Sequence, residues 1–314
     1  GGFMAVSWTD FVQGTIMFIA IVSLPIIAIV QEGGPGVTFA NLQEQYPELL
    51  RLGVNETGET LSLMAIFSLL AWGLGYLGQP HILARFMAIK HSSQIKKARR
   101  IAIIWVFISL GCAMLVGLLG NLLLPNTLSG SDTETVFIYL VDLLSSPVFT
   151  GVLLSAILAA IMSTADSQLL VASSALTEDI YRIIYPKASQ KQLIWIGRGA
   201  VILIAIIAFF IAYNPEASVL ELVAYAWAGF GAAFGPLILF SLYWKNMTYS
   251  GAIAGVVTGG LTVLIWKQLT GGFFDLYEII PGFICSALSI FLFSFWGKPV
   301  SEQVKNEFKS IESF

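Results

Sequence analysis

The sequence has few charged residues. Only 11% of its 314 residues are charged, whereas soluble domains carry about 25%. Hydrophobic residues make up 57% of the chain. This balance excludes an ordinary soluble domain and favours a bundle of transmembrane helices. The net charge of −3 indicates no nucleic-acid partner.

Cysteine and histidine are also scarce, and several motifs are absent. The two cysteines, Cys112 and Cys285, both lie in apolar runs and predict no disulfide framework. The two histidines, His81 and His91, match no metal-ligand spacing. The chain contains no GxSG or HExxH motif, and no GxGD motif accompanies its intramembrane aspartates. A membrane enzyme is therefore not favoured, and we expect no covalent chemistry.

Eight runs of about 20 apolar residues each predict transmembrane helices. The runs are 3–30, 61–84, 101–124, 148–176, 193–213, 218–243, 249–269 and 277–297. The sequence therefore predicts an all-α, polytopic membrane protein with about eight transmembrane helices.

Charge in the connecting segments predicts the orientation. Lysine and arginine concentrate in the second, fourth and sixth segments between the runs and in the tail. The odd-numbered segments hold only Arg51 and Lys267, together with many acidic residues. By the positive-inside rule, the even-numbered segments and both ends of the chain are expected to be cytoplasmic. We expect a multi-pass protein of the cell inner (plasma) membrane.

The fourth run contains an unexpected polar cluster, in the stretch ILAAIMSTADSQ. On a helix, Ala160, Ser163, Thr164 and Ser167 fall on one face, and Asp166 points near the same side. A carboxylate in hydrocarbon costs about 2.5–3.5 kcal/mol on insertion scales and marks an ion path by default. Hydroxyl, carbonyl and carboxylate oxygens suit a hard cation such as Na⁺. Two alternatives are a proton relay through the aspartate, and hydroxyls that only bond back to their own helix.

The second run contains residues that disrupt a helix. In the stretch SLLAWGLGYLGQPHILARF, three glycines precede a proline: Gly73, Gly75, Gly78 and Pro80. Glycine is unfavourable in a helix and proline removes a backbone hydrogen bond. We predict a break between Gly73 and Pro80, and discontinuous helices of this kind form solute sites in secondary transporters. The alternative is a helix kink packed with aromatic side chains.

Glycines repeat every four residues in the sixth and seventh runs. Gly231 and Gly235 lie in the sixth run, and Gly251, Gly255 and Gly259 lie in the seventh. Such stripes let helix backbones approach closely. We interpret them as bundle packing.

Five stretches of the chain resemble the solute:sodium symporter family, in particular its proline-transporting members. The stretches are GGFMAVSWTDFVQG, WGLGYLGQPHILARFMA, SAILAAIMSTADSQLLVASSALTEDIY, VAYAWAGFGAAFGPLILFSLYW and LYEIIPGF. They are long, specific and spread over the whole chain. The resemblance covers only the later part of such a symporter, so we expect earlier helices of the same protein to precede this chain.

The resemblance implies a leucine-transporter-type fold with two inverted five-helix repeats and peripheral helices. Residues 1–30 would form the last helix of the first repeat, and 61–243 the second repeat. Residues 249–297 would form two peripheral helices, and 298–314 a cytoplasmic tail. All would belong to one transporter domain spanning 1–314.

The resemblance also assigns the first set of site residues. In the family, Na⁺ lies between the first core helix and the helix that matches the fourth run. Carried over, Ala160 supplies a backbone carbonyl, and Ser163 and Thr164 supply hydroxyls. The partner carbonyls come from an earlier helix.

Further residues follow from the same resemblance. Trp72, Tyr76 and Pro80, spaced every four residues, match the family's solute-contacting face. Asp10, in SWTD, matches an aspartate tied to sodium use. Asp166 stands where the proline-transporting members have a hydroxyl. With Asp10 and Ser167 it would build a second Na⁺ site; the alternative is a structural carboxylate paired with an arginine or a backbone cap.

The implied function is secondary active transport, in which inward Na⁺ flow drives uptake of L-proline or a similar small solute. Na⁺ would be the coupling ion, and the lipid bilayer the surrounding medium. The alternatives are a symporter of the same family for another small organic solute, a channel, and a non-transporting membrane sensor. Uptake that saturates and follows the sodium gradient distinguishes a symporter from the last two.

Overall fold

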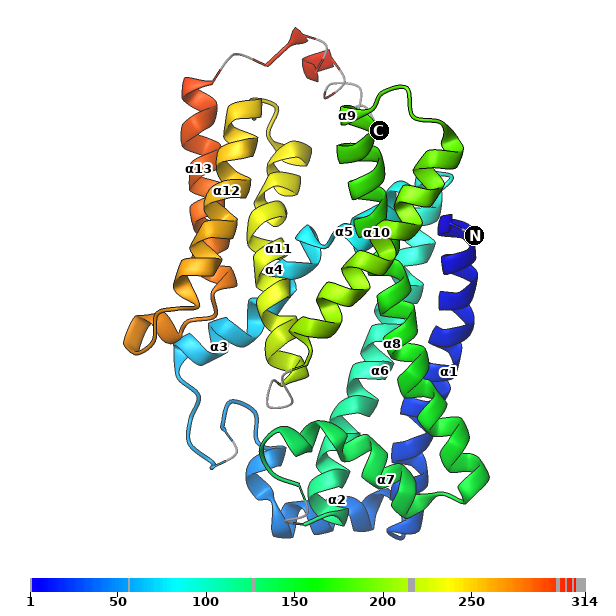
Figure 1. The fold of residues 1–314 in the computed structure, drawn as a ribbon. Coiled ribbons are helices and arrows are strands. Elements are labelled where there is room, and N and C mark those ends of the chain that lie inside the picture. The colour runs from blue at the N-terminus through cyan, green and yellow to red at the C-terminus, as the bar shows by residue number, and fades with distance from the viewer. Residues whose placement is uncertain are drawn as a thin grey trace. The chain divides into compact units, whose positions relative to one another are not determined.

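The computed structural model is helical wherever it describes regular structure (Figure 1). It describes residues 2–55, 57–125, 128–213, 218–297, 300–302, 304–306 and 308. Most of the predicted tail at 298–314 lies outside the described residues. The predicted all-α class is confirmed.

Two compact units make up the chain, and each is described by itself. The first comprises Gly1–Glu59 and Ala88–Ala217, and the second comprises Thr60–Met87 and Ser218–Phe314. The first unit contains α1 (Gly2–Gln31), α2 (Pro35–Gln45), η1 (Pro47–Leu50), η3 (Ser92–Gln94), α6 (Ile95–Leu123), η4 (Gly130–Thr135), α7 (Val136–Leu144), α8 (Pro147–Ser174), η5 (Ala175–Tyr181), α9 (Arg182–Ile184) and α10 (Gln190–Ile211). The second contains α3 (Leu63–Leu70), α4 (Trp72–Gly75), η2 (Tyr76–Gly78), α5 (Pro80–Met87), α11 (Val219–Tyr243), α12 (Tyr249–Trp266), η6 (Gly272–Asp275) and α13 (Ile279–Trp296).

The helices match the predicted transmembrane runs. Among the described residues, seven helices are long and apolar enough to cross a membrane, and the number is eight if one bent pair counts as a single span. Each predicted run coincides with one of these helices, and the second run coincides with the bent pair. The predicted set of about eight spans is confirmed.

In the first unit, α1, α6 and α8 pack together (Figure 1). Their contact is apolar, and Leu24, Leu119 and Leu153 are almost completely buried in it. The short helix α7, which the sequence analysis did not predict, adds Leu140 and Val141 to the same core. This packing places the polar stretch of α8 beside the first half of α1.

The helix that carries the polar cluster is much longer than a bilayer requires. It runs without a break from Pro147 to Ile184, 38 residues in all, through α8, the π-helix η5 and α9. At 1.5 Å per residue it is about 57 Å long, against about 30 Å of hydrocarbon. The helix is continuous through Ser163, so a bilayer can hold it only if it extends past the hydrocarbon or crosses at a tilt.

In the second unit, α11, α12 and α13 pack side by side (Figure 1). The glycine stripe of α12 makes this close approach possible, because a Cβ at Gly251 would overlap Ser294 and one at Gly255 would overlap Ile290. The interpretation of these glycines as packing residues is confirmed.

The second predicted run is a broken helix in the same unit. α3 and α4 are separated by Ala71, and the chain then tightens into the 3₁₀-helix η2. Gln79 has an extended backbone (φ −77°, ψ 115°), and α5 starts at Pro80. The two halves of the span are bent by 49° at this point. The predicted break between Gly73 and Pro80 is confirmed.

Candidate functional site

Three oxygen atoms meet on one turn of α8. The hydroxyls of Ser163 and Thr164 each donate a hydrogen bond to the carbonyl of Ala160, both over 3.1 Å. Ser163 is half-buried and Thr164 is exposed within the first unit. The structure thus brings together all three residues predicted to hold Na⁺, and it also shows both hydroxyls bonding back to their own helix.

A second polar contact lies about one turn further along α8. The Ser167 hydroxyl donates to Asp10 Oδ2 over 3.0 Å, which links α8 to α1. Ser167 is only 6% exposed, so this bond lies in the packed interface. Two of the three residues predicted for a second ion site are therefore in direct contact.

Asp166, the third residue of that set, is half-buried on α8. Its carboxylate makes no hydrogen bond or ion pair with any residue that the structure describes. The arginine or cap considered for it in the sequence analysis is thus not observed in the described ranges.

The predicted solute-contacting residues lie at the break in the second unit, within an aromatic cluster. Trp72 is half-buried and stacks on two rings: that of Trp227, with ring centroids 5.6 Å apart, and that of Tyr277, at 6.4 Å. Tyr76 points its ring edge-on to Trp227 at 4.8 Å and is 48% exposed. Trp72 is therefore held by its neighbours, whereas Tyr76 presents an open ring.

The regular face predicted for Trp72, Tyr76 and Pro80 is interrupted. The chain changes from α-helix to 3₁₀-helix at Tyr76 and bends before Pro80. Residues four apart lie about 120° apart around a 3₁₀-helix, so a spacing of four no longer keeps side chains on one side.

Side chains satisfy the backbone groups that the break exposes. The indole N–H of Trp227 donates to the Trp72 carbonyl over 2.9 Å. The Gln79 amide donates to the carbonyls of Gly75 (3.2 Å) and Trp227 (3.3 Å), and Gln79 is only 4% exposed. Unpaired backbone groups are costly away from water, so these two side chains stabilise the break.

Tyr277 fixes the other side of the aromatic cluster. Its hydroxyl donates to the Ala224 carbonyl over 2.8 Å, and its backbone N–H donates to the Ser68 hydroxyl over 3.1 Å. These two hydrogen bonds hold the Tyr277 ring in place, where it stacks on Trp72.

Sequence reasoning missed Trp227, Gln79 and Tyr277. Gln79 carried a detectable signal, because it is an uncharged polar residue next to the proline of an apolar run. Trp227 and Tyr277 had none, since each lies some 150 residues or more along the chain from the partner it contacts at the break.

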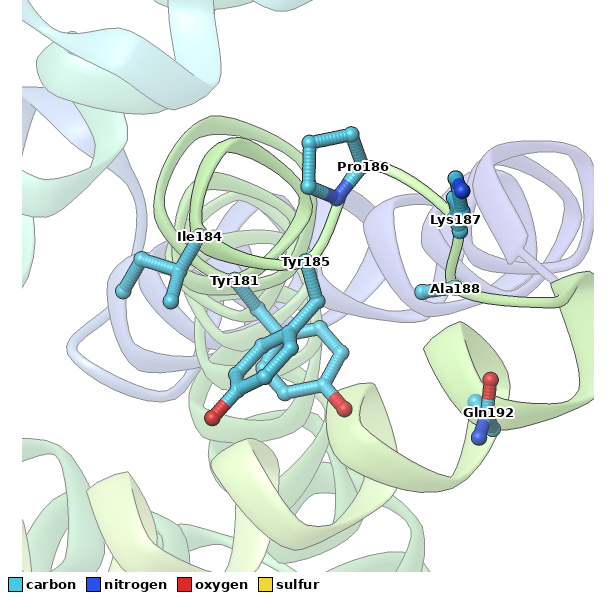
Figure 2. Close-up of a pocket in the computed structure, with 7 residues that line it drawn as sticks. All are labelled: Tyr181, Ile184, Tyr185, Pro186, Lys187, Ala188 and Gln192. Carbon is cyan, nitrogen blue, oxygen red and sulfur yellow. The ribbon is translucent and has the colours of Figure 1, made fainter.

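A separate hollow of about 430 Å³ lies in the first unit, at the junction of η5, α9 and α10 (Figure 2). Tyr181 and Tyr185 line it with rings 5.0 Å apart, and Lys187 and Gln192 face it from the loop and α10. None of the predicted site residues lines this hollow.

Comparison with known proteins decides the family. The model of the Sodium:solute symporter family matches residues 1–259. The chain belongs to this family. Proline transporters from several bacteria are similar to it over nearly its whole length.

Among these relatives, the sodium/proline symporter of Escherichia coli (strain K12) is 47% identical over 100% of this chain and 62% of its own length. The high-affinity proline transporter PutP of Bacillus subtilis (strain 168) is 47% identical over 99% of this chain and 65% of its own. The osmoregulated proline transporter OpuE of the same strain is 50% identical over 92% of this chain and 58% of its own length. The chain thus spans about three-fifths of the length of these relatives.

One solved structure has the same fold. It is a Na⁺-coupled sialic acid symporter in a substrate-bound, outward-open state with a novel Na⁺ site. The match has a TM-score of 0.71 at 18% identity and covers 96% of this chain and 64% of that one. This likeness confirms the predicted leucine-transporter-type helix bundle.

Proposed function

We propose that this chain is part of a secondary transporter that couples inward Na⁺ flow to the uptake of L-proline. The observation that carries the proposal is the 47% identity, over the entire chain, to the sodium/proline symporter of Escherichia coli. Family membership supports Na⁺ as the coupling ion, and seven long apolar helices among the described residues support a multi-pass protein in the plasma membrane.

The α8 cluster is the proposed Na⁺ site. A dehydrated Na⁺ needs protein oxygens in place of water, and Ala160, Ser163 and Thr164 present three on one turn. Both hydroxyls donate to the Ala160 carbonyl, so the three groups satisfy one another. Ion binding would turn at least one proton away, which frees the carbonyl to coordinate. The remaining ligands would come from helices that precede this chain.

Asp10, Asp166 and Ser167 form the proposed second Na⁺ site. The bond between Asp10 and Ser167 supports it, because that bond already draws a carboxylate and a hydroxyl together across α1 and α8. Asp166 adds a second carboxylate with no competing partner among the described residues. Two carboxylates held close together repel each other, and a cation bound between them would offset that repulsion.

The broken span is the proposed solute site, with Trp72, Tyr76 and Pro80 as contacts. The apolar methylene side of the pyrrolidine ring fits against rigid aromatic side chains, and the half-exposed ring of Tyr76 offers such a surface. The aromatic stack around Trp72 would keep that surface fixed.

The topology follows from the charge distribution and the fold. We propose that both ends of the chain are cytoplasmic, as the positive-inside rule implies. α1 would be the last helix of the first inverted repeat, and residues 61–243 the second repeat. α12 and α13 would be peripheral helices of one transporter domain.

Uptake of labelled proline by cells that express the complete transporter tests the function. We expect saturable uptake that follows the sodium gradient and stops when choline replaces sodium. Sodium-dependent uptake of another small organic solute, without proline uptake, would point to a different symporter of the family. Sodium-independent flux would indicate a channel, and the absence of any flux a sensor.

Replacing Tyr76 with alanine is expected to raise the KM for proline about tenfold, because the variant loses the exposed ring that faces the solute. The sodium concentration for half-maximal uptake, measured at saturating proline, should change less than about threefold. Tyr76→Phe keeps the ring and serves as the matched control. Unchanged proline kinetics in Tyr76→Ala would exclude this residue from the solute site.

A further inference from the structure

A buried polar atom on α1 has no partner. The side-chain carbonyl oxygen of Gln13 is shielded from solvent and accepts no hydrogen bond from any residue that the structure describes. A buried acceptor that has given up water without gaining a donor is destabilising. Native proteins keep few such groups, and a bound ion or water commonly explains them.

Two contacts fix how α1 lies against the helix with the polar cluster. Asp10 accepts a hydrogen bond from Ser167, and the Gln31 amide donates to the carbonyl of Leu144, just before α8, over 3.0 Å. From residue 10 to residue 31 of α1, the residue that is contacted moves back along the chain from 167 to 144, so α1 and α8 run antiparallel. Three residues after Asp10, Gln13 is therefore level with about residue 164, the turn that carries Ser163 and Thr164.

The side of α1 that carries Gln13 is also defined. Gln13 and Gln31 are 18 residues apart, about five turns of helix, so both point in nearly the same direction. Gln31 reaches the Leu144 carbonyl at the end of α7, three residues before α8 begins at Pro147. Gln13 is also one turn from Asp10, which bonds to α8 itself. Both neighbours place Gln13 on the α8-facing side of α1.

We propose that the amide oxygen of Gln13 is a further Na⁺ ligand, which faces the Ser163–Thr164 turn from α1. The inference rests on the proposed Na⁺-coupled function and extends it by one residue on a second helix. An amide carbonyl is a hard, neutral donor of the kind that Na⁺ accepts. A cation on α8 alone would have all its protein oxygens on one side; Gln13 supplies one from across the interface, level with the Ser163–Thr164 turn.

Two substitutions at Gln13 test whether its side-chain oxygen binds Na⁺. Gln13→Leu removes the oxygen and keeps the approximate size, whereas Gln13→Glu keeps an oxygen and adds a negative charge. In the complete transporter, we expect Gln13→Leu to raise the sodium concentration for half-maximal uptake about tenfold. Gln13→Glu should bind Na⁺ at least as tightly as the wild type.

A binding readout that needs no transport accompanies the uptake assay. For the purified transporter in detergent, the midpoint of thermal unfolding is followed as NaCl replaces choline chloride, because a ligand of the native state raises that midpoint. We expect the rise to need about tenfold more sodium in Gln13→Leu. If Gln13→Leu instead unfolds at a higher temperature with an unchanged sodium titration, the oxygen is only an unsatisfied packing group and the proposal is wrong.

Two further variants separate the possible failures. If Gln13→Leu does not fold, Gln13→Asn decides, since it withdraws the oxygen by one methylene; an unchanged sodium titration there overturns the proposal. The Ser163→Ala/Thr164→Ala double variant serves as the reference. If it shifts the sodium titration and the Gln13 variants do not, this inference fails and the proposed function stands. If neither shifts it, the proposed ion site itself is wrong.

Discussion

Replacing Ser163 and Thr164 together with alanine is expected to raise the sodium concentration for half-maximal proline uptake by tenfold or more. The change removes two of the three oxygens on the α8 turn without adding bulk. A tenfold loss of sodium affinity corresponds to about 1.4 kcal/mol of binding free energy, which is a modest loss for the removal of two ion ligands. Affinity for proline should fall only through lost coupling, so very high sodium should partly restore it.

The matched control is Ser155→Ala on the same helix. The Ser155 hydroxyl also bonds back to its own helix, donating to the Val152 carbonyl over 2.6 Å, but it lies outside the proposed site. Loss of a back-bonded hydroxyl as such should therefore leave the sodium dependence unchanged. A double variant that keeps the wild-type half-saturation, measured as proline uptake against sodium concentration, would mean that Ser163 and Thr164 are only back-bonded and that Na⁺ binds elsewhere.

The sequence predicted the membrane spans better than the ends of the helices. Hydropathy marks the residues that can sit in hydrocarbon, and a helix continues past them wherever its residues favour helix. α6 begins at Ile95, before the predicted run at 101, because lysine and arginine are good helix formers whose charged ends reach water. α8 likewise continues through η5 and α9, beyond the predicted end at 176.

The candidate sites were predictable where their residues break a local rule. Hydroxyls and a carboxylate in an apolar run led to Ser163 and Asp166, and glycines before a proline led to the break between Gly73 and Pro80. Contacts between distant segments gave no such sign. Trp227 looks like one more aromatic in a glycine-rich helix until the fold brings the Trp72 carbonyl beside it. Gln13 looks like an ordinary polar residue until the fold buries its side-chain oxygen.

Gly75→Ala is expected to lower the thermal stability of the transporter strongly, because the break has no room for a side chain at this position. A Cβ on Gly75 would overlap the indole ring of Trp227, the ring whose N–H holds the Trp72 carbonyl. The α11 backbone is also close, since a Cβ at Gly231 would come within 2.7 Å of the Gly75 Cα. Overpacking of this kind costs about 1–3 kcal/mol or more.

The neighbouring glycine supplies the control for this last prediction. A Cβ at Gly73 would meet nothing within 4 Å. Alanine is more favourable than glycine in a helix by about 0.5–1 kcal/mol, so Gly73→Ala should leave the midpoint of thermal unfolding unchanged or raise it. Gly75→Ala should lower that midpoint by several degrees, and it should also raise the KM for proline, because a displaced Trp227 no longer supports the edge of Tyr76. If both variants unfold at the same temperature, the packing of α11 against the break is looser than these contacts imply. Trp227 would then not be what holds the Trp72 carbonyl and the Tyr76 ring in position.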